Sequence, residues 1–302
     1  MRRRTIILAT IAALAAQVIF GFSFMFTKVA IDYASPMTVI ANRYMVAFLA
    51  ITVVIIAFKI KIRFDGNMRK LILMSCFQPI LYFVFETYGI AMTTSAFSSV
   101  MISLIPVASM ICGIFMLKEI PTPMQYVFTV LSVVGVVIMA VTGSAEGVVT
   151  PIGILFLLGA VISSVGYNIM SRKISDEFTA FERTYAMMII GMIFFVTVAL
   201  VENIHNPLSL ITSFSESGYV AAVIYLGVIS SVVAFLLLNY ANTHLPVAKT
   251  TVFSNITTAV SVIAGAVYLK EELSAKTIIA VMMIVVGVWG VQLIGIKWRE
   301  IK

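Results

Sequence analysis

Gln78, Tyr82 and Glu86 follow one another at intervals of four residues in the stretch FQPILYFVFETYGI, residues 77–90. Side chains four residues apart lie on one face of an α-helix, so the sequence predicts a polar stripe within an apolar segment. Pro79 lacks a backbone N–H and is expected to loosen the helix beside Gln78, which would free a carbonyl oxygen. Such a stripe could bind a cation or exchange a proton through the Glu86 carboxylate.

The role of Glu86 depends on the solvent around its helix, and the composition indicates that solvent. Hydrophobic residues make up 61% of the 302 and charged residues 11%, whereas soluble domains contain about 25% charged residues. Ten apolar segments can be recognised, each of roughly the 18–26 residues that a helix needs to cross about 30 Å of hydrocarbon. They are 6–31, 37–58, 71–92, 97–117, 124–142, 151–172, 180–201, 218–240, 247–269 and 276–297. The predicted fold class is an all-α integral membrane protein with ten transmembrane helices.

The basic residues indicate how these helices are oriented. With the N-terminus inside, 15 of the 20 Lys and Arg residues fall at helix ends on the cytoplasmic side, which places both termini in the cytoplasm by the positive-inside rule. Orientation thereby explains the net charge of +7, and no nucleic-acid partner is expected. Residues 1–16 imitate a signal peptide, but the apolar run continues to Ala30, which favours a retained first span. We expect a monomer in the lipid bilayer of the cytoplasmic membrane, crossing it many times.

A shift of 152 residues brings the second half of the chain into partial register with the first. The matched pairs include Tyr88 with Tyr240, Leu117-Lys118-Glu119 with Leu269-Lys270-Glu271, and Gly135 with Gly287. At a smaller shift, Asn42-Arg43 falls on Glu182-Arg183. Residues 1–146 and 147–302 are therefore predicted to be two five-helix repeats, and the odd number of helices inserts the second repeat upside down. Inverted repeats are the architecture of many secondary transporters.

Four features extend across the chain: L-K-E after spans four and nine, Pro106 in span four, Asn42-Arg43-Tyr44 near the start of span two, and the glycines of spans five and ten. Together they resemble the EamA family of the drug/metabolite transporter superfamily. The resemblance implies a ten-helix inverted-repeat fold with a central cavity built from spans 1, 3, 4, 6, 8 and 9. It also implies movement of small polar metabolites, often export of amino acids. Thr258 stands where the repeat would place a second proline, so any proline-dependent bend is not symmetric.

Glu86 has two possible roles. An ionisable side chain at mid-depth in a membrane is costly, so Glu86 is expected to face the interior of the helix bundle. There the carboxylate could exchange protons or bind the ammonium group of an amino acid or amine. Alternatively it could neutralise Lys28 or Arg43, which lie near the same ends of their spans. Its repeat partner is Leu238, so the two halves would share a scaffold but not a chemistry.

Further candidates for a substrate or coupling site are polar residues in the neighbouring spans. Arg43 and Arg183, which the repeat places at equivalent positions, could each hold a substrate carboxylate, pair with a loop acid or reach the membrane interface. The uncharged candidates are Gln17, Ser23, Asn168, Tyr225, Asn239 and Asn255. Buried amides and hydroxyls also join membrane helices, at about 0.6 kcal/mol each, so these side chains have a purely structural alternative.

No motif for catalysis or metal binding accompanies these residues. The sequence has no P-loop, no G-x-S-x-G and no H-E-x-x-H. Cys76 and Cys112 lie inside spans, and His205 and His244 lie in loops on opposite sides, so no cofactor, metal site or enzymatic activity is expected. The sequence favours a secondary transporter of a small-molecule substrate by alternating access, with proton coupling through Glu86 as a hypothesis. The alternatives are a flippase for lipid or lipid-linked substrates and a membrane scaffold or sensor without transport.

Overall fold

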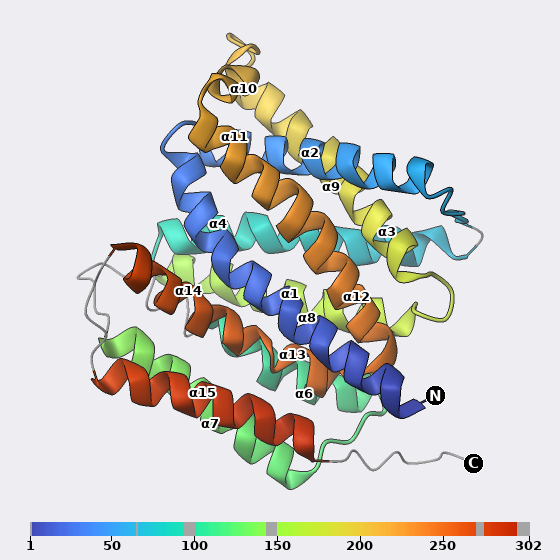
Figure 1. Ribbon diagram of the computed structural model, residues 1–302, viewed down its shortest axis with the longest axis vertical. Helices are drawn as coiled ribbons and strands as arrows, with labels where there is room; N and C mark the ends of the chain where they lie inside the picture. The colour runs from blue at the N-terminus through green and yellow to red at the C-terminus, as the bar shows by residue number, and fades with distance from the viewer. Residues whose placement is uncertain (1, 65, 94–100, 143–149, 270–274, 295–302) are drawn as a thin grey trace.

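The computed structural model describes the chain apart from residues 1, 65, 94–100, 143–149, 270–274 and 295–302, and every regular element in the described ranges is a helix (Figure 1). The first half contains α1 (Arg2–Ile31), α2 (Pro36–Ala57), α3 (Met68–Ser75), η1 (Cys76–Leu81), α4 (Tyr82–Ala91), α6 (Ile105–Leu117) and α7 (Pro123–Thr142). The second half contains α8 (Pro151–Lys173), α9 (Ala180–Glu202), α10 (Ser209–Thr212), η2 (Ser213–Ser215), α11 (Ser217–Ile224), η3 (Tyr225–Val233), α12 (Ala234–His244), α13 (Val247–Thr251), α14 (Ser254–Leu269) and α15 (Ala275–Leu293).

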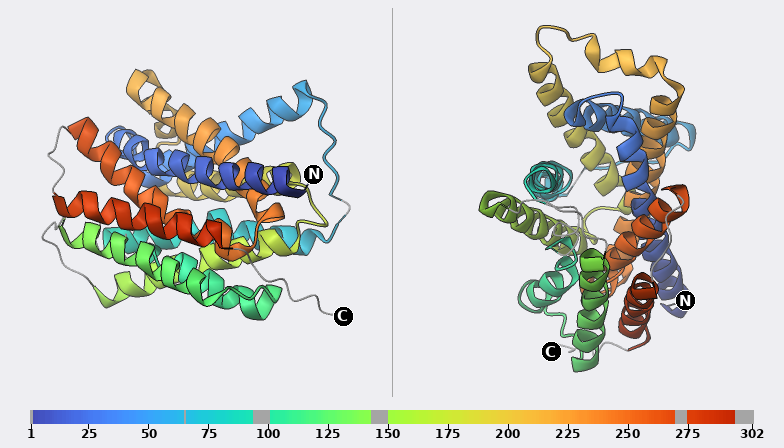
Figure 2. Two further views of the ribbon diagram at one scale, coloured as in Figure 1. Left: turned by 60° about the horizontal axis from the view of Figure 1, so that its bottom comes forward. Right: turned by 90° about the vertical axis from the view of Figure 1, so that its left-hand side faces the viewer.

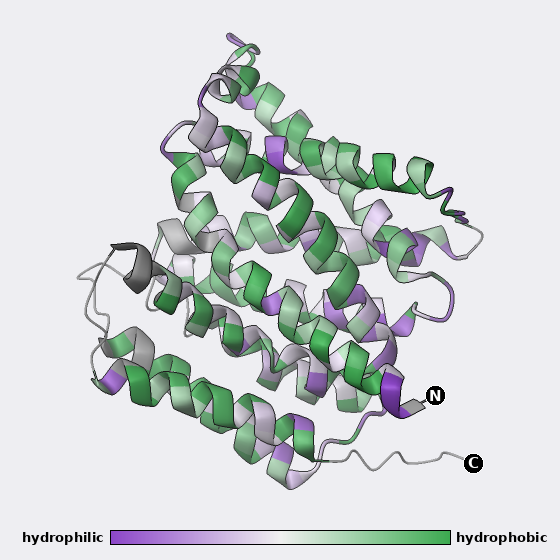
Figure 3. Ribbon diagram, in the orientation of Figure 1, coloured by the Kyte–Doolittle hydropathy of each residue, from purple (hydrophilic) through white to green (hydrophobic). Residues whose placement is uncertain are grey.

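Six helical segments of the described chain are long and apolar enough to cross a membrane. They are Arg3–Ile31, Pro36–Ala57, Met68–Gly89, Pro151–Lys173, Ala180–Glu202 and Ser217–His244, which coincide with predicted spans one, two, three, six, seven and eight. Apolar residues cover these helices along most of their length, and hydrophilic ones gather at helix ends and in loops (Figure 3). The predicted all-helical membrane fold is confirmed at this level. The count of ten spans, the two-repeat division and the side of the termini stay predictions.

The helix starts follow local sequence signals. Ser35 caps α2 by accepting a hydrogen bond from the Thr38 N–H, and Pro36 occupies the first turn, where its missing N–H leaves no helix hydrogen bond unmade. Thr179 and Glu182 form a reciprocal capping box at the start of α9. The predicted span 247–269 is less regular, because α13 ends at Thr251 and α14 begins at Ser254.

The third span is interrupted at the predicted proline. α3, η1 and α4 follow one another without a gap, but Gln78 within the π-helical η1 has an extended backbone with φ −145° and ψ 121°. A residue that precedes proline is disfavoured in the α region, which accounts for the conformation beside Pro79. The expected loosening is confirmed, whereas the single regular stripe from Gln78 to Glu86 is wrong, since only Tyr82 and Glu86 share an uninterrupted α-helix. The eighth span also contains a π-helical segment, η3, between α11 and α12.

α7 and α15 lie side by side along one edge of the molecule (Figures 1 and 2). Their backbones approach closely at glycines: a Cβ atom on Gly287 would lie 2.6 Å from the carbonyl oxygen of Phe128, and one on Gly135 would lie 2.7 Å from that of Ala280. Small residues permit this approach between membrane helices. Elsewhere α1 packs against α12 and α14, and α2 packs against α9 and η3.

Segments predicted to be cytoplasmic meet at one end of the bundle. Lys70, in the first turn of α3, and Glu177, in the loop after α8, form an ion pair with an N–O distance of 2.5 Å. At the same predicted side, Glu119 of the first L-K-E tripeptide accepts a hydrogen bond from the backbone N–H of Val247 at 2.7 Å and pairs with Arg172 at 3.3 Å. These contacts join the two halves of the chain at one end of the bundle, while the side of the membrane that this end faces stays a prediction.

Candidate functional site

Glu86 lies on α4 and is partly buried. The Tyr82 hydroxyl donates a hydrogen bond to Glu86 Oε1 at 2.8 Å, so the predicted four-residue relation between these side chains is present. In the described part of the chain, the Glu86 carboxylate has no cation within 4.0 Å, and its Oε2 receives no hydrogen bond. The Lys28 side chain, one proposed counter-ion, lies outside the described residues.

Arg43 lies on α2 and is only 6% exposed. Its Nε donates to Ser231 Oγ at 2.7 Å and its Nη2 donates to Ser230 Oγ at 3.1 Å. The guanidinium carbon is 5.0 Å from the centroid of the Phe83 ring, a cation–π distance. Arg43 also interacts electrostatically with Glu86, although the two do not form a direct ion pair. Of the predicted site residues, the structure thus brings Arg43, Tyr82 and Glu86 together.

Sequence reasoning missed three participants in this cluster. Ser230 and Ser231 are fully buried on η3, and Phe83 on α4 contributes its ring face to Arg43. Two adjacent hydroxyls in the apolar stretch YLGVISSVV, residues 225–233, were a signal available in the sequence. Their partner Arg43 could not be identified from the sequence, because it lies 188 positions from Ser231, farther than the length of one predicted repeat.

Gln78 is buried on η1 but stands apart from this cluster. Its side-chain oxygen has no hydrogen-bond partner among the described residues, and no interaction joins it to Tyr82 or Glu86. The interruption at Pro79 accounts for this separation, because it removes Gln78 from the regular turn of α4.

Arg183 is fully buried at the start of α9, and protein acceptors satisfy its guanidinium. Nη1 donates to the carbonyl and hydroxyl oxygens of Ser171 at 2.5 and 2.8 Å, and Nη2 donates to the carbonyl of Asn239 at 2.9 Å. Nη2 also bonds to Thr243, and Nε donates to the Thr179 carbonyl at 3.4 Å. This arginine joins α8, α9 and α12 and holds no carboxylate within 4.0 Å among the described residues.

Asn239 and Asn168 belong to the same interhelical network. The Asn239 side-chain oxygen accepts hydrogen bonds from Tyr167 at 3.1 Å and Ser171 at 2.7 Å, and its amide nitrogen donates to Thr184 at 3.0 Å. Asn168 donates to the Ser164 carbonyl within its own helix and accepts from Asn242 on α12 at 3.2 Å. Both amides therefore join helices in this structure, which is the structural alternative expected for buried polar groups.

The remaining uncharged candidates are also bonded to other parts of the chain. Gln17 accepts a hydrogen bond from Thr257 at 2.8 Å, which joins α1 to α14. Ser23 donates to a carbonyl of its own helix at 2.7 Å. Asn255 donates to Ser132 on α7 at 2.8 Å, although its side-chain oxygen is buried without a partner in the described chain. Tyr225 donates to the Ile19 carbonyl at 3.0 Å and stacks on Phe26, with ring centroids 4.0 Å apart.

The two arginines are not at equivalent positions relative to the helix starts. The cap of α2 is Ser35 and that of α9 is Thr179, so Arg43 lies eight residues after its cap and Arg183 four residues after its own. Aligned by their caps, Arg43 corresponds to Met187. The sequence match of Asn42-Arg43 with Glu182-Arg183 was therefore offset by one helical turn, and the arginines reach different neighbours.

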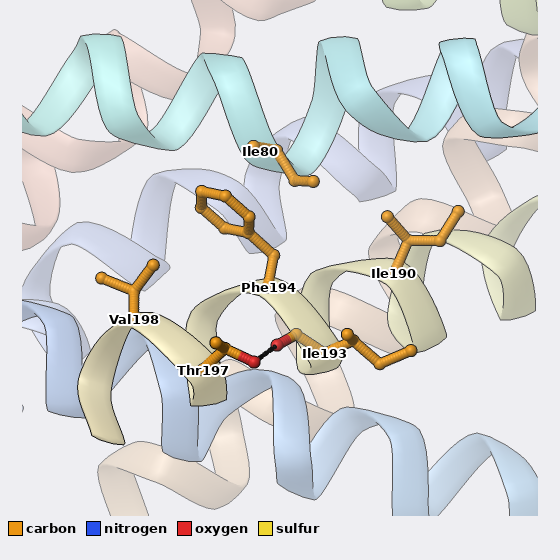
Figure 4. Close-up of a pocket in the computed structure, with 6 residues that line it drawn as sticks. All are labelled: Ile80, Ile190, Ile193, Phe194, Thr197 and Val198. Atoms are coloured by element: carbon orange, nitrogen blue, oxygen red, sulfur yellow. Dashed lines mark hydrogen bonds between the residues drawn. The ribbon is translucent and has the colours of Figure 1, made fainter. Parts of the chain in front are cut away.

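A shallow apolar groove lies apart from the cluster, between η1 and α9 (Figure 4). Its volume is about 430 Å³, and it is lined by Ile80, Ile190, Ile193, Phe194, Thr197 and Val198. Thr197, the polar member, donates its hydroxyl hydrogen to the Ile193 carbonyl at 2.6 Å. Ile193 is 58% exposed, so the groove opens onto the outer surface of the helix bundle. None of the candidate site residues lines it.

Comparison with known proteins shows the family of the chain. The model of the EamA-like transporter family matches two stretches that cover most of the chain, residues 7–141 and 151–293. The chain belongs to the EamA-like transporter family. Membership confirms the resemblance drawn from the L-K-E tripeptides and the glycine pattern, including its place in the drug/metabolite transporter superfamily.

Relatives of this EamA-family transporter agree with that assignment. The uncharacterized transporter YcxC of Bacillus subtilis is 34% identical over 289 residues, which cover 93% of this chain and 92% of the relative. An uncharacterized transporter of Archaeoglobus fulgidus is 23% identical over 269 residues, 89% of this chain and 93% of its own. A crystal structure with 16% identity superposes with a TM-score of 0.78 over 94% of this chain and 96% of that chain, which supports the fold. The EamA-family protein is thus a multi-pass membrane transporter.

Proposed function

We propose that this transporter exports a small zwitterionic metabolite of the amino-acid class across the cytoplasmic membrane by alternating access. The observation that carries the proposal is the placement of Arg43 on α2 and Glu86 on α4. The two charges interact electrostatically but lie beyond 4.0 Å from each other. A zwitterion carries one group for each of them: a carboxylate for the guanidinium and an ammonium for the carboxylate.

Glu86 also supplies a route for proton coupling. It is partly exposed, and one of its two oxygens receives no hydrogen bond from the described residues. A carboxylate whose surroundings alternate between wet and dry can gain and release a proton, because desolvation penalises its charged form. The sequence has no ATP-binding P-loop, so an ion gradient is the energy source that fits this chain.

Flux measurements in proteoliposomes test this function. The purified protein is reconstituted, and uptake of each radiolabelled L-amino acid is followed with and without an imposed pH gradient. We expect at least one amino acid to accumulate with the gradient, and Glu86→Gln to abolish that accumulation. Glu177→Gln, a matched change in a loop, is the control. Absence of flux for every amino acid would overturn the substrate class, and undiminished gradient-driven flux in Glu86→Gln would overturn the coupling role.

A flippase for lipid substrates is a second candidate, which the apolar groove between η1 and α9 favours. The groove could accept an acyl chain, but its lining contains no charged or amide side chain to accompany a polar headgroup. We therefore rank it below the amino-acid transporter. A dithionite-quenching assay with a fluorescent phosphatidylcholine in the same proteoliposomes separates the two: lipid scrambling without amino-acid flux would favour the flippase.

A further inference from the structure

The Arg43 guanidinium donates hydrogen bonds to one element, η3, and to no other element of the described chain. A guanidinium has five N–H donors, and two of those of Arg43 are used, by Ser231 and Ser230 on η3. Nη1 has no hydrogen-bond partner in the described part of the chain, where no carboxylate oxygen approaches Arg43 within 4.0 Å. Both serine side chains are fully buried, so these two bonds are made away from water.

Arg183 is a buried arginine of the same fold that serves for comparison, because protein oxygens bond to all of its side-chain nitrogens. All three of its nitrogens donate to protein oxygens, and the acceptors are carbonyls and hydroxyls of α8, α12 and the α9 cap. Arg43 has similarly low exposure, but only two of its N–H donors bond to residues that the structure describes. A buried cation without a full set of acceptors is costly, which favours an anionic group from outside the protein as the missing partner.

We infer that Ser230 and Ser231 are positioning residues that fix the Arg43 guanidinium for the carboxylate of the transported substrate. This inference rests on the proposed function and names a part of the protein that recognises one group of the zwitterion. The serines engage Nε and Nη2, which prevents rotation of the planar group and leaves Nη1 for the carboxylate. The Phe83 ring face, 5.0 Å from the guanidinium carbon, supports the group from another helix.

The carboxylate of Glu86 would recognise the second charged group of the substrate, its ammonium. Tyr82 occupies Glu86 Oε1, and Oε2 stays available for an ammonium group. A substrate with both charges satisfies Arg43 and Glu86 together, whereas an amine that lacks the carboxylate leaves the guanidinium unpaired. Recognition of one group by a fixed donor set gives strong discrimination, because the analogue that lacks the group leaves buried donors without a partner.

Ligand stabilisation of the purified full-length protein tests the inference. The probes are amino acids and their decarboxylated amines: L-phenylalanine with phenethylamine, L-lysine with cadaverine, L-histidine with histamine and L-leucine with isoamylamine. Ligand that binds the folded protein raises its melting temperature by mass action, so each pair gives a ratio of apparent Kd values. For wild type we expect at least one amino acid to bind about tenfold or more tightly than its amine, or about 1.4 kcal/mol.

The variants are Ser230→Ala, Ser231→Ala and the double change, with Ser109→Ala as matched control. Ser109 is a fully buried serine on α6 whose hydroxyl has no partner in the described chain. We expect the serine variants to lose the amino-acid preference at least tenfold while amine binding stays unchanged, and Ser109→Ala to keep both. Ser231→Thr, which retains a hydroxyl, should restore the preference relative to Ser231→Ala. The single variants keep the test decisive if the double variant does not fold.

Two results would overturn the inference while transport stands: equal binding of amino acid and amine by wild type, or full preference retained in Ser230→Ala and Ser231→Ala but lost in Arg43→Lys. The proposed function fails separately, when no radiolabelled amino acid shows flux in proteoliposomes.

Discussion

Arg43 Nε and Ser231 Oγ are joined by a hydrogen bond of 2.7 Å, although the two residues are 188 positions apart in the chain. The bond connects α2, from the first predicted repeat, to η3, from the second. In inverted-repeat transporters the two repeats move against each other around a site near mid-membrane. The proposed alternating access therefore predicts that this contact between the repeats changes when substrate binds.

The two buried arginines should respond differently to replacement by methionine. Arg183→Met should lower the free energy of unfolding by about 3 kcal/mol or more, because several buried oxygens would each lose a donor at a cost of roughly 1–3 kcal/mol. Arg43→Met should lower stability less, since Ser230 and Ser231 alone among the described residues lose a donor, but should reduce amino-acid flux about tenfold or more. Thermal unfolding in detergent and flux in proteoliposomes measure both effects. Equal losses of stability would contradict the assignment of separate roles.

Tyr82→Phe should impair transport without impairing the fold. The change removes only the hydroxyl that donates to Glu86 Oε1 and keeps the ring that packs among the helices. We expect kcat/KM for amino-acid flux to fall about tenfold or more, with a melting temperature close to that of wild type. Tyr88→Phe, on the same helix but 42% exposed, serves as control. An unchanged kcat/KM in Tyr82→Phe would show that the hydroxyl does not assist Glu86.

Much of the helical framework could be predicted because membrane thickness fixes it. The predicted span 151–172 and the helix Pro151–Lys173 differ by one residue, and the segment 37–58 is matched as well by Pro36–Ala57. The break beside Gln78 could also be predicted from Pro79, since the restriction that proline places on the preceding residue is local. Periodicity alone could not predict that the break would take Gln78 out of the stripe.

The partners of buried charges could not be predicted, because they come from distant segments. Arg43 and Arg183 look alike in sequence, and only the folded chain shows that one bonds to two serines of η3 while the other is satisfied by Ser171, Asn239 and their neighbours. The interhelical roles of Gln17 and Asn255 were among the stated alternatives. Their actual partners depend on which helices pack together, and apolar membrane helices carry little sequence information about that.

Glu177→Gln should change how stability depends on acid. The hydrogen bond from Lys70 holds the pKa of the Glu177 carboxyl below its ordinary value of 4.5. A lowered pKa in the folded state stabilises the protein above pH 4.5, and this contribution disappears as the pH falls through the lowered pKa. Melting temperatures of wild type should therefore fall on acidification below pH 4.5 more steeply than those of Glu177→Gln. Asp176→Asn is the control; an equal acid dependence in wild type and Glu177→Gln would contradict the prediction.

Glu119 should show the opposite dependence. Burial raises the pKa of its carboxyl above 4.5, against the opposing effects of the Val247 N–H and Arg172. A raised pKa in the folded state stabilises the protein below pH 4.5, and this contribution is lost as the pH rises through the raised pKa. Glu119→Gln keeps an oxygen that can accept from Val247 and cannot titrate, so the melting temperature of this variant should decline less over that pH range. A decline as steep as that of wild type would show that Glu119 does not titrate differently in the folded state.

Gly287→Ala should destabilise the packed pair α7 and α15. A Cβ at this position would lie 2.6 Å from the Phe128 carbonyl oxygen and 2.7 Å from the Ser132 backbone nitrogen, which cannot move aside as a flexible side chain does. Overpacking of this kind costs typically about 1–3 kcal/mol. Gly113→Ala is the matched control, because a Cβ there meets nothing within 4 Å. Thermal unfolding in detergent should show a lower melting temperature for Gly287→Ala than for wild type. Gly113→Ala should not lower the melting temperature, since alanine favours the helix more than glycine does. Equal melting temperatures of the two variants would mean that α7 and α15 accommodate the added Cβ without loss of stability.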